Sequence, residues 1–140
     1  MCRRYVGCYT QKLFHVDGKG TGVAAFQLTD AEKGTLSYID TFDAGENPSY
    51  LIANKEGTRM YAVNEMHDSE SSITALSIDR DTGALTKLAT QSCVGLAGCF
   101  LELDPSEQFV IAANYLSGTL GVLPVDEEGI VLMCTITSLL

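Results

Sequence analysis

The chain has 140 residues, 46% of them hydrophobic and 19% charged, which indicates one globular domain and excludes a multidomain enzyme and a disordered segment. Eighteen acidic against nine basic residues give a formal net charge of -9, so neither nucleic acid nor an anionic membrane is expected as a partner. No apolar run approaches the roughly 20 residues that span a bilayer, and no signal-type stretch follows Met1. We therefore expect a cytoplasmic protein whose five cysteines are reduced structural thiols.

Taken in chain order, short segments of alternating polarity separated by turn residues predict an all-β chain. The expected strands are Arg4–Tyr9, Gly22–Leu28, Thr35–Phe42, Ser49–Asn54, Arg59–Asn64, Ser72–Ile78, Ala84–Thr90, Cys99–Leu103, Gln108–Asn114, Thr119–Val125 and Ile130–Ile136. The segments Asn54–Gly57 and Asp104–Glu107 have the residues of tight turns, so consecutive strands are expected to pair as antiparallel hairpins. The glycine-rich segment Gly18–Gly22 is interpreted as a flexible connection between strands, because no helix follows it to bind a phosphate.

The chain repeats itself with an offset of about 50 residues. At this offset Tyr50 aligns with Phe100 and Asn64 aligns with Asn114. An acidic turn that ends in glycine and is followed by an aliphatic residue occurs three times, at Thr29–Leu36, Asp79–Leu85 and Asp126–Val131. Each repeat has the size and the four alternating strands of a β-propeller blade, whereas a jelly roll or an immunoglobulin-like sandwich predicts no such repeat.

The predicted fold is therefore an incomplete β-propeller of between two and three four-stranded antiparallel blades, with repeats at 4–45, 46–95 and 96–137 of one partial domain spanning 1–140. Because a closed propeller takes four to eight blades, three alternatives stay open. The chain is a fragment of a longer protein, a truncated product, or a unit that self-associates through its open blade edges.

Candidate functional residues lie where the innermost strand of a blade begins and where its second strand ends, because ligands bind at one mouth of a propeller. Glu65 is the candidate general base, and its alternative is a solvated loop carboxylate. The candidate substrate-binding residues are Asn64, Asn114, Tyr50, Cys99 and Phe100. For the two asparagines the alternative is a turn former that bonds its own backbone. His15 and His67 are expected to be exposed loop histidines.

Four stretches in order make the chain resemble the seven-bladed lactonases, a family that includes propeller-type 6-phosphogluconolactonases and carboxy-muconate cyclases. These stretches are Tyr5–Thr10, Asn47–Leu51, Tyr61–Glu65 and Ala112–Gly118. The resemblance runs from about Tyr5 to Val131 and covers the N-terminal part of the family's fold. One departure is Phe100, which stands where the family commonly has the histidine of a Pro-Cys-His segment.

The resemblance implies hydrolysis of 6-phosphogluconolactone or a similar sugar lactone, in carbohydrate metabolism and the oxidative pentose phosphate route. It implies no metal ion and no organic cofactor. The alternative function, which Phe100 favours, is a catalytically inactive propeller-type module that binds a protein or a small ligand. A third interpretation is a truncated product that forms no stable fold.

Overall fold

A computed structural model describes residues 2–139 of the chain, and it is built from antiparallel β-strands joined by turns. The strands are β1 (Arg3–Gly7), β2 (Lys12–Leu13), β3 (Val16–Asp17), β4 (Val23–Asp30), β5 (Thr35–Phe42), β6 (Pro48–Ala53), β7 (Arg59–Asn64), β8 (Ser72–Ile78), β9 (Leu85–Ser92), β10 (Gly98–Leu103), β11 (Phe109–Asn114), β12 (Thr119–Pro124) and β13 (Ile136–Leu139). Within this part of the chain, no helix is long and apolar enough to cross a membrane.

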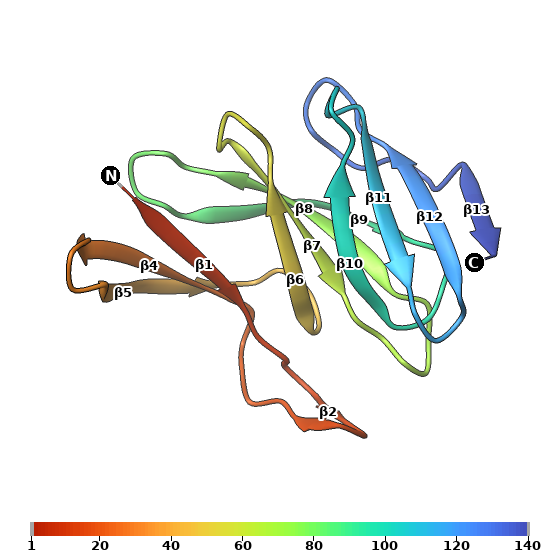
Figure 1. Ribbon diagram of the computed structural model, residues 1–140, viewed down its shortest axis with the longest axis horizontal. Helices are drawn as coiled ribbons and strands as arrows, with labels where there is room; N and C mark the ends of the chain where they lie inside the picture. Colours follow the sequence, from red (N-terminus) through yellow and green to blue (C-terminus); the bar gives the residue numbers. More distant parts are fainter. Residues whose placement is uncertain (1, 140) are drawn as a thin grey trace.

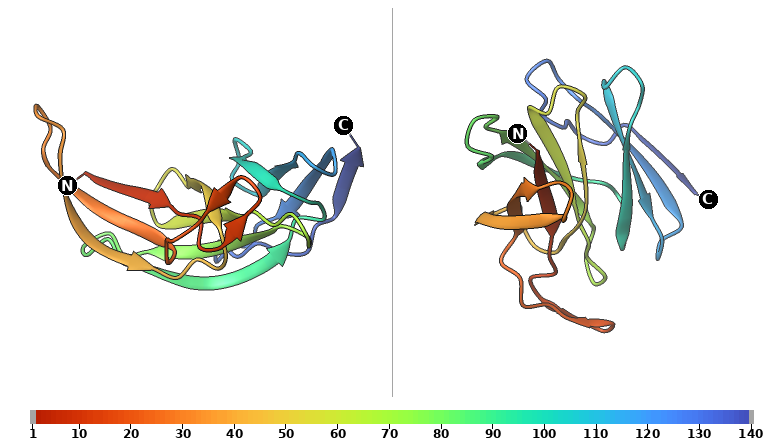
Figure 2. Two further views of the ribbon diagram at one scale, coloured as in Figure 1. Left: turned by 90° about the horizontal axis from the view of Figure 1, so that it is seen from below. Right: turned by 60° about the vertical axis from the view of Figure 1, so that its left-hand side comes forward.

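The strands form three successive sheets that follow one another along a gently curved body (Figures 1 and 2). Their strand orders are β1-β4-β5, β6-β7-β8-β9 and β10-β11-β12-β13, and β2 pairs with β3 in a small separate hairpin. The two chain ends lie at opposite ends of the body, and the sheets do not close into a ring (Figure 1). The fold is therefore an incomplete propeller of three blade-like sheets, as the strand pattern and the repeat predict.

The middle sheet is buried on both faces, because side chains alternate between the two faces of a strand. On β7, Met60 and Ala62 pack toward the first sheet, in one apolar cluster with Val23. The intervening Tyr61 and Val63 pack in a second cluster with residues of the third sheet. The members of this second cluster from the third sheet include Leu101, Val110, Ala112 and Leu123. Each cluster thus fills the space between two neighbouring sheets.

The last strand differs from the sequence prediction of Ile130–Ile136. Val131 is buried and forms an isolated bridge to Val125, but the regular strand begins only at Ile136, where it pairs with β12. The amide of Leu132 donates to Pro124 O at 2.8 Å and that of Thr135 donates to Val122 O at 3.1 Å, so two extra residues, Met133 and Cys134, separate the two stretches. The reason for the difference is therefore a bulge, which shifts the register and interrupts the ladder.

The first sheet has three strands, in agreement with the three strands expected before residue 45, and is one strand short of a complete four-stranded blade. β1 pairs with β4 through five residue pairs from Arg3–Gln27 to Gly7–Val23, and its other edge carries no paired strand among the described residues. In the first sheet β1 is followed by β4 and β5, in the same way that β7 is followed by β8 and β9 in the second sheet. β1 therefore occupies the place of a blade's second strand.

Candidate functional site

Glu65 lies directly after the C-terminal end of β7, on the side of the molecule where the innermost strands β6 and β10 begin (Figure 1). Its backbone amide donates to the carbonyl of Asn47 at 3.0 Å, just before β6. The repeat reproduces this contact in the third sheet, where the amide of Tyr115 donates to Ala97 O at 3.1 Å. The same backbone geometry therefore presents Glu65 from one blade and Tyr115 from the next.

Glu65 is 5% exposed, and each of its two carboxylate oxygens has a side-chain partner. The hydroxyl of Tyr9 donates to Oε2 at 2.8 Å, and Nε2 of His67 lies 3.0 Å from Oε1. Burial opposes ionisation, but the hydrogen bonds from His67 and Tyr9 outweigh it, so the pKa of Glu65 lies below its ordinary value. Glu65 is therefore an ionised, buried carboxylate and not a solvated loop residue.

The hydrogen bond between Tyr9 and Glu65 shifts the pKa of Tyr9 in the opposite direction, upward. Burial and the hydrogen bond to the Glu65 carboxylate raise the pKa of Tyr9 to about 12. Its phenol is therefore neutral at physiological pH and acts as a donor. Asn47 fixes this arrangement, because its Oδ1 accepts from the amides of Thr10 and Gln11, each at 3.0 Å, while its Nδ2 donates to Glu65 O at 3.2 Å.

The short hairpin β2–β3 brings His15 to the same place, and the sequence analysis did not predict it. The chain returns along itself, since Gly18 donates to Gln11 O at 3.1 Å and Gly20 donates to Tyr9 O at 2.9 Å. A Cβ atom at Gly20 would lie 2.3 Å from the Cβ atom of Cys8, so this close approach requires glycine. The glycine-rich segment thus sets the hairpin geometry and is more than a flexible connection.

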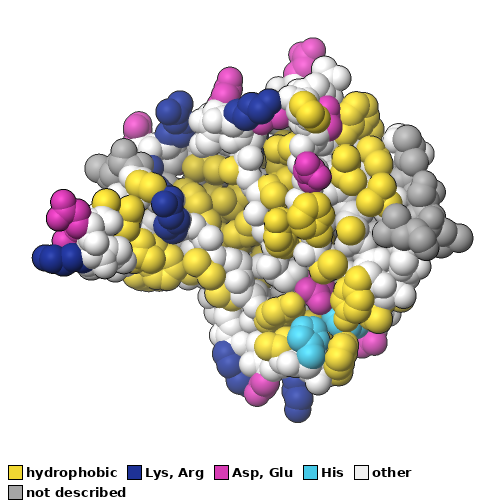
Figure 3. All heavy atoms as spheres, viewed as in Figure 1, with side chains coloured by type: hydrophobic (Ala, Val, Ile, Leu, Met, Phe, Trp, Pro, Cys, Tyr) yellow, Lys and Arg dark blue, Asp and Glu magenta, His cyan; other side chains and the backbone are white. Residues whose placement is uncertain are grey.

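Aromatic rings surround the carboxylate. The ring centroids of His15 and His67 are 5.2 Å apart, and Phe14 contacts His15 at 4.8 Å and His67 at 4.9 Å in edge-to-face geometry. The ring centroid of Tyr115 lies 6.1 Å from that of His67. Figure 3 shows the histidine side chains at the viewed surface, bordered by hydrophobic and acidic side chains. The site is therefore a carboxylate beneath an aromatic rim that solvent can reach.

The expectation that both histidines are exposed is wrong for His67. Its side chain is 7% exposed, whereas His15 is exposed on the hairpin. His67 is buried because it packs beneath Phe14 and beside Tyr115 while it bonds to Glu65. The neighbouring Asp68 suggested a polar loop, but the packing partners come from distant parts of the chain.

Asn64 is buried at the end of β7 and forms a brace, that is, a set of side-chain hydrogen bonds that holds the segment preceding β6. Its Nδ2 donates to the carbonyls of Ala44 and Glu46 at 2.7 and 2.8 Å, and its Oδ1 accepts from the Thr74 hydroxyl at 2.7 Å. A sugar oxygen would therefore compete with short internal hydrogen bonds for this side chain.

Asn114 repeats the arrangement in the third sheet, where it is also buried. Its Nδ2 donates to Cys93 O and to the Thr119 hydroxyl, both at 3.2 Å. The sequence repeat thus preserves a brace between the end of a second strand and the segment that leads into its own blade.

Tyr50 and Phe100 are brought together on the neighbouring innermost strands β6 and β10, with ring centroids 5.2 Å apart. Both rings are partly exposed, at 38% and 43%, and they line a groove with Ile52 and Leu103. Cys99 is exposed, and partial desolvation and then the negative charge of Glu65 raise the pKa of its thiol. Of the predicted site residues, the structure therefore brings Tyr50 and Phe100 into contact.

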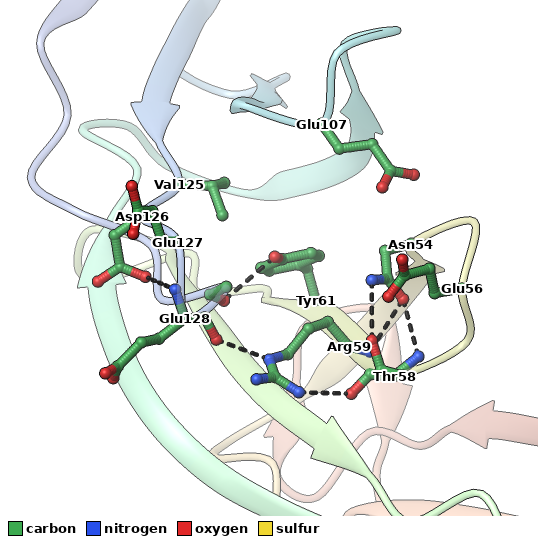
Figure 4. Close-up of a pocket in the computed structure, with 11 residues that line it drawn as sticks. Asn54, Glu56, Thr58, Arg59, Tyr61, Glu107, Val125, Asp126, Glu127 and Glu128 are labelled. Atoms are coloured by element: carbon green, nitrogen blue, oxygen red, sulfur yellow. Dashed lines mark hydrogen bonds between the residues drawn. The ribbon is translucent and has the colours of Figure 1, made fainter.

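A separate pocket lies at the seam between the second and third sheets (Figure 4). Arg59 Nε donates to Glu128 O at 2.7 Å, and the Tyr61 hydroxyl donates to Gly129 O at 3.1 Å. The guanidinium is thus engaged with backbone, and five of the other lining residues carry carboxylates, namely Glu56, Glu107 and Asp126 to Glu128. This lining disfavours an anionic sugar phosphate.

The hydrogen bonds from Arg59 and Tyr61 to the turn at Gly129 form an inter-sheet clamp, and the same arrangement occurs at the boundary between the first and second sheets. On β1, Arg3 donates to Arg80 O at 2.6 Å and the Tyr5 hydroxyl donates to Gly83 O at 3.0 Å, as Arg59 and Tyr61 do at the next seam. In both cases an Arg-x-Tyr strand holds the acidic, glycine-ending turn of the following blade. The repeated turn that the sequence revealed is therefore an inter-sheet contact.

The sequence analysis missed Tyr9, His15 and His67 as members of the site. Tyr9 lies within Tyr5–Thr10, one of the stretches that carry the family resemblance, so a signal was present for it. His67 follows Glu65 by two positions after a strand end, which is a weaker signal. For His15 no local signal exists, because its approach depends on the return of the glycine-rich segment.

Comparisons with known proteins agree with this architecture. Residues 3–135 match the family model described as lactonase, 7-bladed beta-propeller. The chain is 38% identical over 125 residues to the 6-phosphogluconolactonase of Bacillus subtilis, with 89% of this chain and 34% of that protein covered. A 6-phosphogluconolactonase of Formosa agariphila is 29% identical over 126 residues, with 89% and 34% covered.

Solved structures extend the comparison. A Bacteroides fragilis protein described as a candidate 6-phosphogluconolactonase superposes with a TM-score of 0.86 at 27% identity, over 99% of this chain and 36% of that chain. The periplasmic gluconolactonase PpgL of Pseudomonas aeruginosa has the same fold, with a TM-score of 0.84 at 22% identity, over 96% and 37%. The chain spans about a third of the length of the relatives that it matches. It belongs to the seven-bladed β-propeller lactonase family and corresponds to a part of that fold.

Proposed function

We propose that this chain carries part of the active site of a lactone hydrolase that acts on a sugar lactone of the 6-phosphogluconolactone type. The single observation that carries the proposal is the ionised carboxylate of Glu65, buried under an aromatic rim at the mouth and bonded to Tyr9 and His67. The names of the B. subtilis and F. agariphila relatives support the substrate class. A place in the cytoplasm and in the pentose phosphate route stays a prediction.

The proposed reaction is the addition of water to the lactone carbonyl. Glu65 accepts a proton from the attacking water, because a carboxylate with a low pKa is unprotonated at neutral pH. The carbonyl oxygen becomes an oxyanion, the bond between the carbonyl carbon and the ring oxygen then breaks as the oxyanion collapses, and the ring oxygen takes up the proton that Glu65 accepted. Each oxygen of Glu65 keeps a free lone pair beside its bond to Tyr9 or His67, so the base is oriented and still accessible.

The partly exposed rings of Tyr50 and Phe100 form the second element of the proposal, as an apolar surface for the sugar ring next to the mouth. The proposal also keeps three polar neighbours of the site, Cys99, Asn64 and Asn114. For the two asparagines, a hydrogen bond to the substrate would compete with the internal hydrogen bonds that they already make.

A second candidate function is a catalytically inactive module that binds a small ligand or a protein. Phe100 favours it, because a phenyl ring transfers no proton at the position where the family commonly has histidine. In this case Glu65 would orient a ligand without activating water.

The test is hydrolysis of freshly prepared 6-phosphogluconolactone, followed against its spontaneous rate on a sample sized by light scattering. We expect a defined species, in which open blade edges self-associate, with a rate above background. The variant Glu65→Gln keeps the shape of the side chain and should lower the rate by about 100-fold or more. The matched control is Glu32→Gln in an exposed turn, which should leave the rate unchanged. Binding of the lactone without hydrolysis would instead support the inactive module.

A further inference from the structure

We propose that His15, Glu65 and His67 form a binding site for one divalent transition-metal ion, with zinc as the ion that best fits the ligand set. One ligand atom from each of these residues lies within 4.8 Å of the others. The inference goes beyond lactone hydrolysis and does not rest on it. It also departs from the expectation of a metal-free protein that the family resemblance suggested.

Both histidines of the chain meet at this site. His15 comes from the β2–β3 hairpin and His67 from the segment after β7, yet their ring centroids are 5.2 Å apart. Such a meeting of residues far apart in the sequence requires the tertiary fold, and it places two neutral nitrogen ligands beside one anionic oxygen ligand. Imidazole is the protein ligand that zinc and its first-row neighbours favour, whereas calcium and magnesium favour oxygen.

A buried nitrogen without a partner is the second, independent observation. Nε2 of His67 lies 3.0 Å from Oε1 of Glu65, and Nδ1 is the other nitrogen of the ring. This Nδ1 atom is buried and has no hydrogen-bond partner in the structure, on a side chain that is 7% exposed. A buried ring nitrogen without a partner is unfavourable, and coordination to a cation would satisfy it.

The charge around the site favours a cation. Among the described residues, no lysine or arginine forms an ion pair with Glu65. The chain also has a formal net charge of -9. An ion bound by the two imidazoles would therefore meet a buried carboxylate whose negative charge no lysine or arginine balances.

The three ligand atoms must move closer together to bind zinc. Tetrahedral zinc with bonds near 2.0 to 2.1 Å places its ligand atoms about 3.3 Å apart, against the 4.8 Å limit seen here. His15 can move to close this difference, because it is exposed on a hairpin whose strands are two residues each. The same exposure gives the ion a path from solvent, and three protein ligands leave a fourth position open, as in catalytic zinc sites.

The experiment is a zinc titration of the full chain, followed by the imidazole signals in carbon-proton correlation NMR spectra. Because the chain has two histidines, each signal is assigned by replacing one residue. We expect both signals to shift together and saturate at one equivalent, and excess chelator to reverse the change. Substitution of one ligand, His15→Asn, should weaken binding at least 10-fold, as judged from the His67 signal. This substitution removes an exposed side chain, so the fold is retained.

The matched control is Asp17→Asn on the same hairpin, which removes an exposed carboxylate outside the site and should leave the affinity unchanged. Zinc bound by the cysteines would leave both imidazole signals in place, and this result would overturn the proposal. A shift of the His15 signal alone, or equal affinity in His15→Asn, would overturn it as well. None of these readouts involves hydrolysis, so failure of the metal site and failure of the lactonase proposal are distinguishable.

Discussion

The inter-sheet clamp predicts that Gly129→Ala is more costly than the same change at Gly34. Both glycines end an acidic turn with a positive φ, 78° at Gly129 and 65° at Gly34. A Cβ atom at Gly34 would meet nothing within 4 Å, whereas at Gly129 it would lie 2.7 Å from Nε of Arg59. The two substitutions therefore share the backbone cost and differ only in their effect on Arg59.

The magnitude follows from these contacts. A left-handed conformation costs an alanine roughly 1 to 2 kcal/mol, and a smaller entropy of the unfolded chain offsets part of it, so Gly34→Ala should lose about 1 kcal/mol. At Gly129 the Arg59 side chain must also move and give up its 2.7 Å bond to Glu128 O. A partly exposed bond from a charged donor adds about 1 to 2 kcal/mol, which makes the loss about 2 to 3 kcal/mol.

Urea unfolding followed by circular dichroism measures both variants under the same conditions. The two variants are repeated in an Arg59→Ala background, where the added methyl group at Gly129 meets no guanidinium. There the two alanine substitutions should cost the same within about 0.5 kcal/mol. Equal losses in the native background would refute the clamp, and so would an excess loss at Gly129 that persists without Arg59.

Two further predictions concern buried polar groups. Asn64→Asp should lower the free energy of unfolding by about 3 kcal/mol, because the carboxylate cannot donate to two backbone carbonyls, and a loss below about 1 kcal/mol would contradict the brace. The control Asn54→Asp should have little effect, since the acceptor Oδ1 that bonds two backbone amides is retained. For Glu65 the lowered pKa means that its contribution to stability is present above its ordinary pKa and is lost as the pH falls. Unfolding of Glu65→Gln measured between about pH 7 and pH 3 should therefore depend less on pH, and an unchanged dependence would contradict the assignment.

The sheets were predictable from the sequence because their cause is local. Residues Met60 to Val63 alternate between two apolar clusters, so the period of two that marks a strand is also the pattern that packs neighbouring sheets. The offset of about 50 residues that aligns Asn64 with Asn114 likewise reflects one brace used twice. The bulge at Met133 and Cys134 was not predictable, since nothing in the local alternation marks two residues that leave the ladder.

The site was less predictable than the fold. Glu65 was identifiable from its place after a strand end, but whether it is solvated or buried depends on Tyr9 and His67. His15 reaches the site only because Gly20 lets the hairpin return against Tyr9 at 2.9 Å. These contacts join segments that are distant in the sequence, so no local pattern encodes them.

Glu65 has a role in both proposals, as the general base for hydrolysis and as a ligand of the metal ion, and these two roles compete. As a base, the carboxylate needs a free lone pair for water, and as a metal ligand it gives that lone pair to the ion. A bound ion would also change the partner of His67, whose Nε2 now lies 3.0 Å from the same carboxylate. Because a bound cation makes a carboxylate a weaker base, zinc should inhibit any hydrolysis that depends on Glu65 as a base.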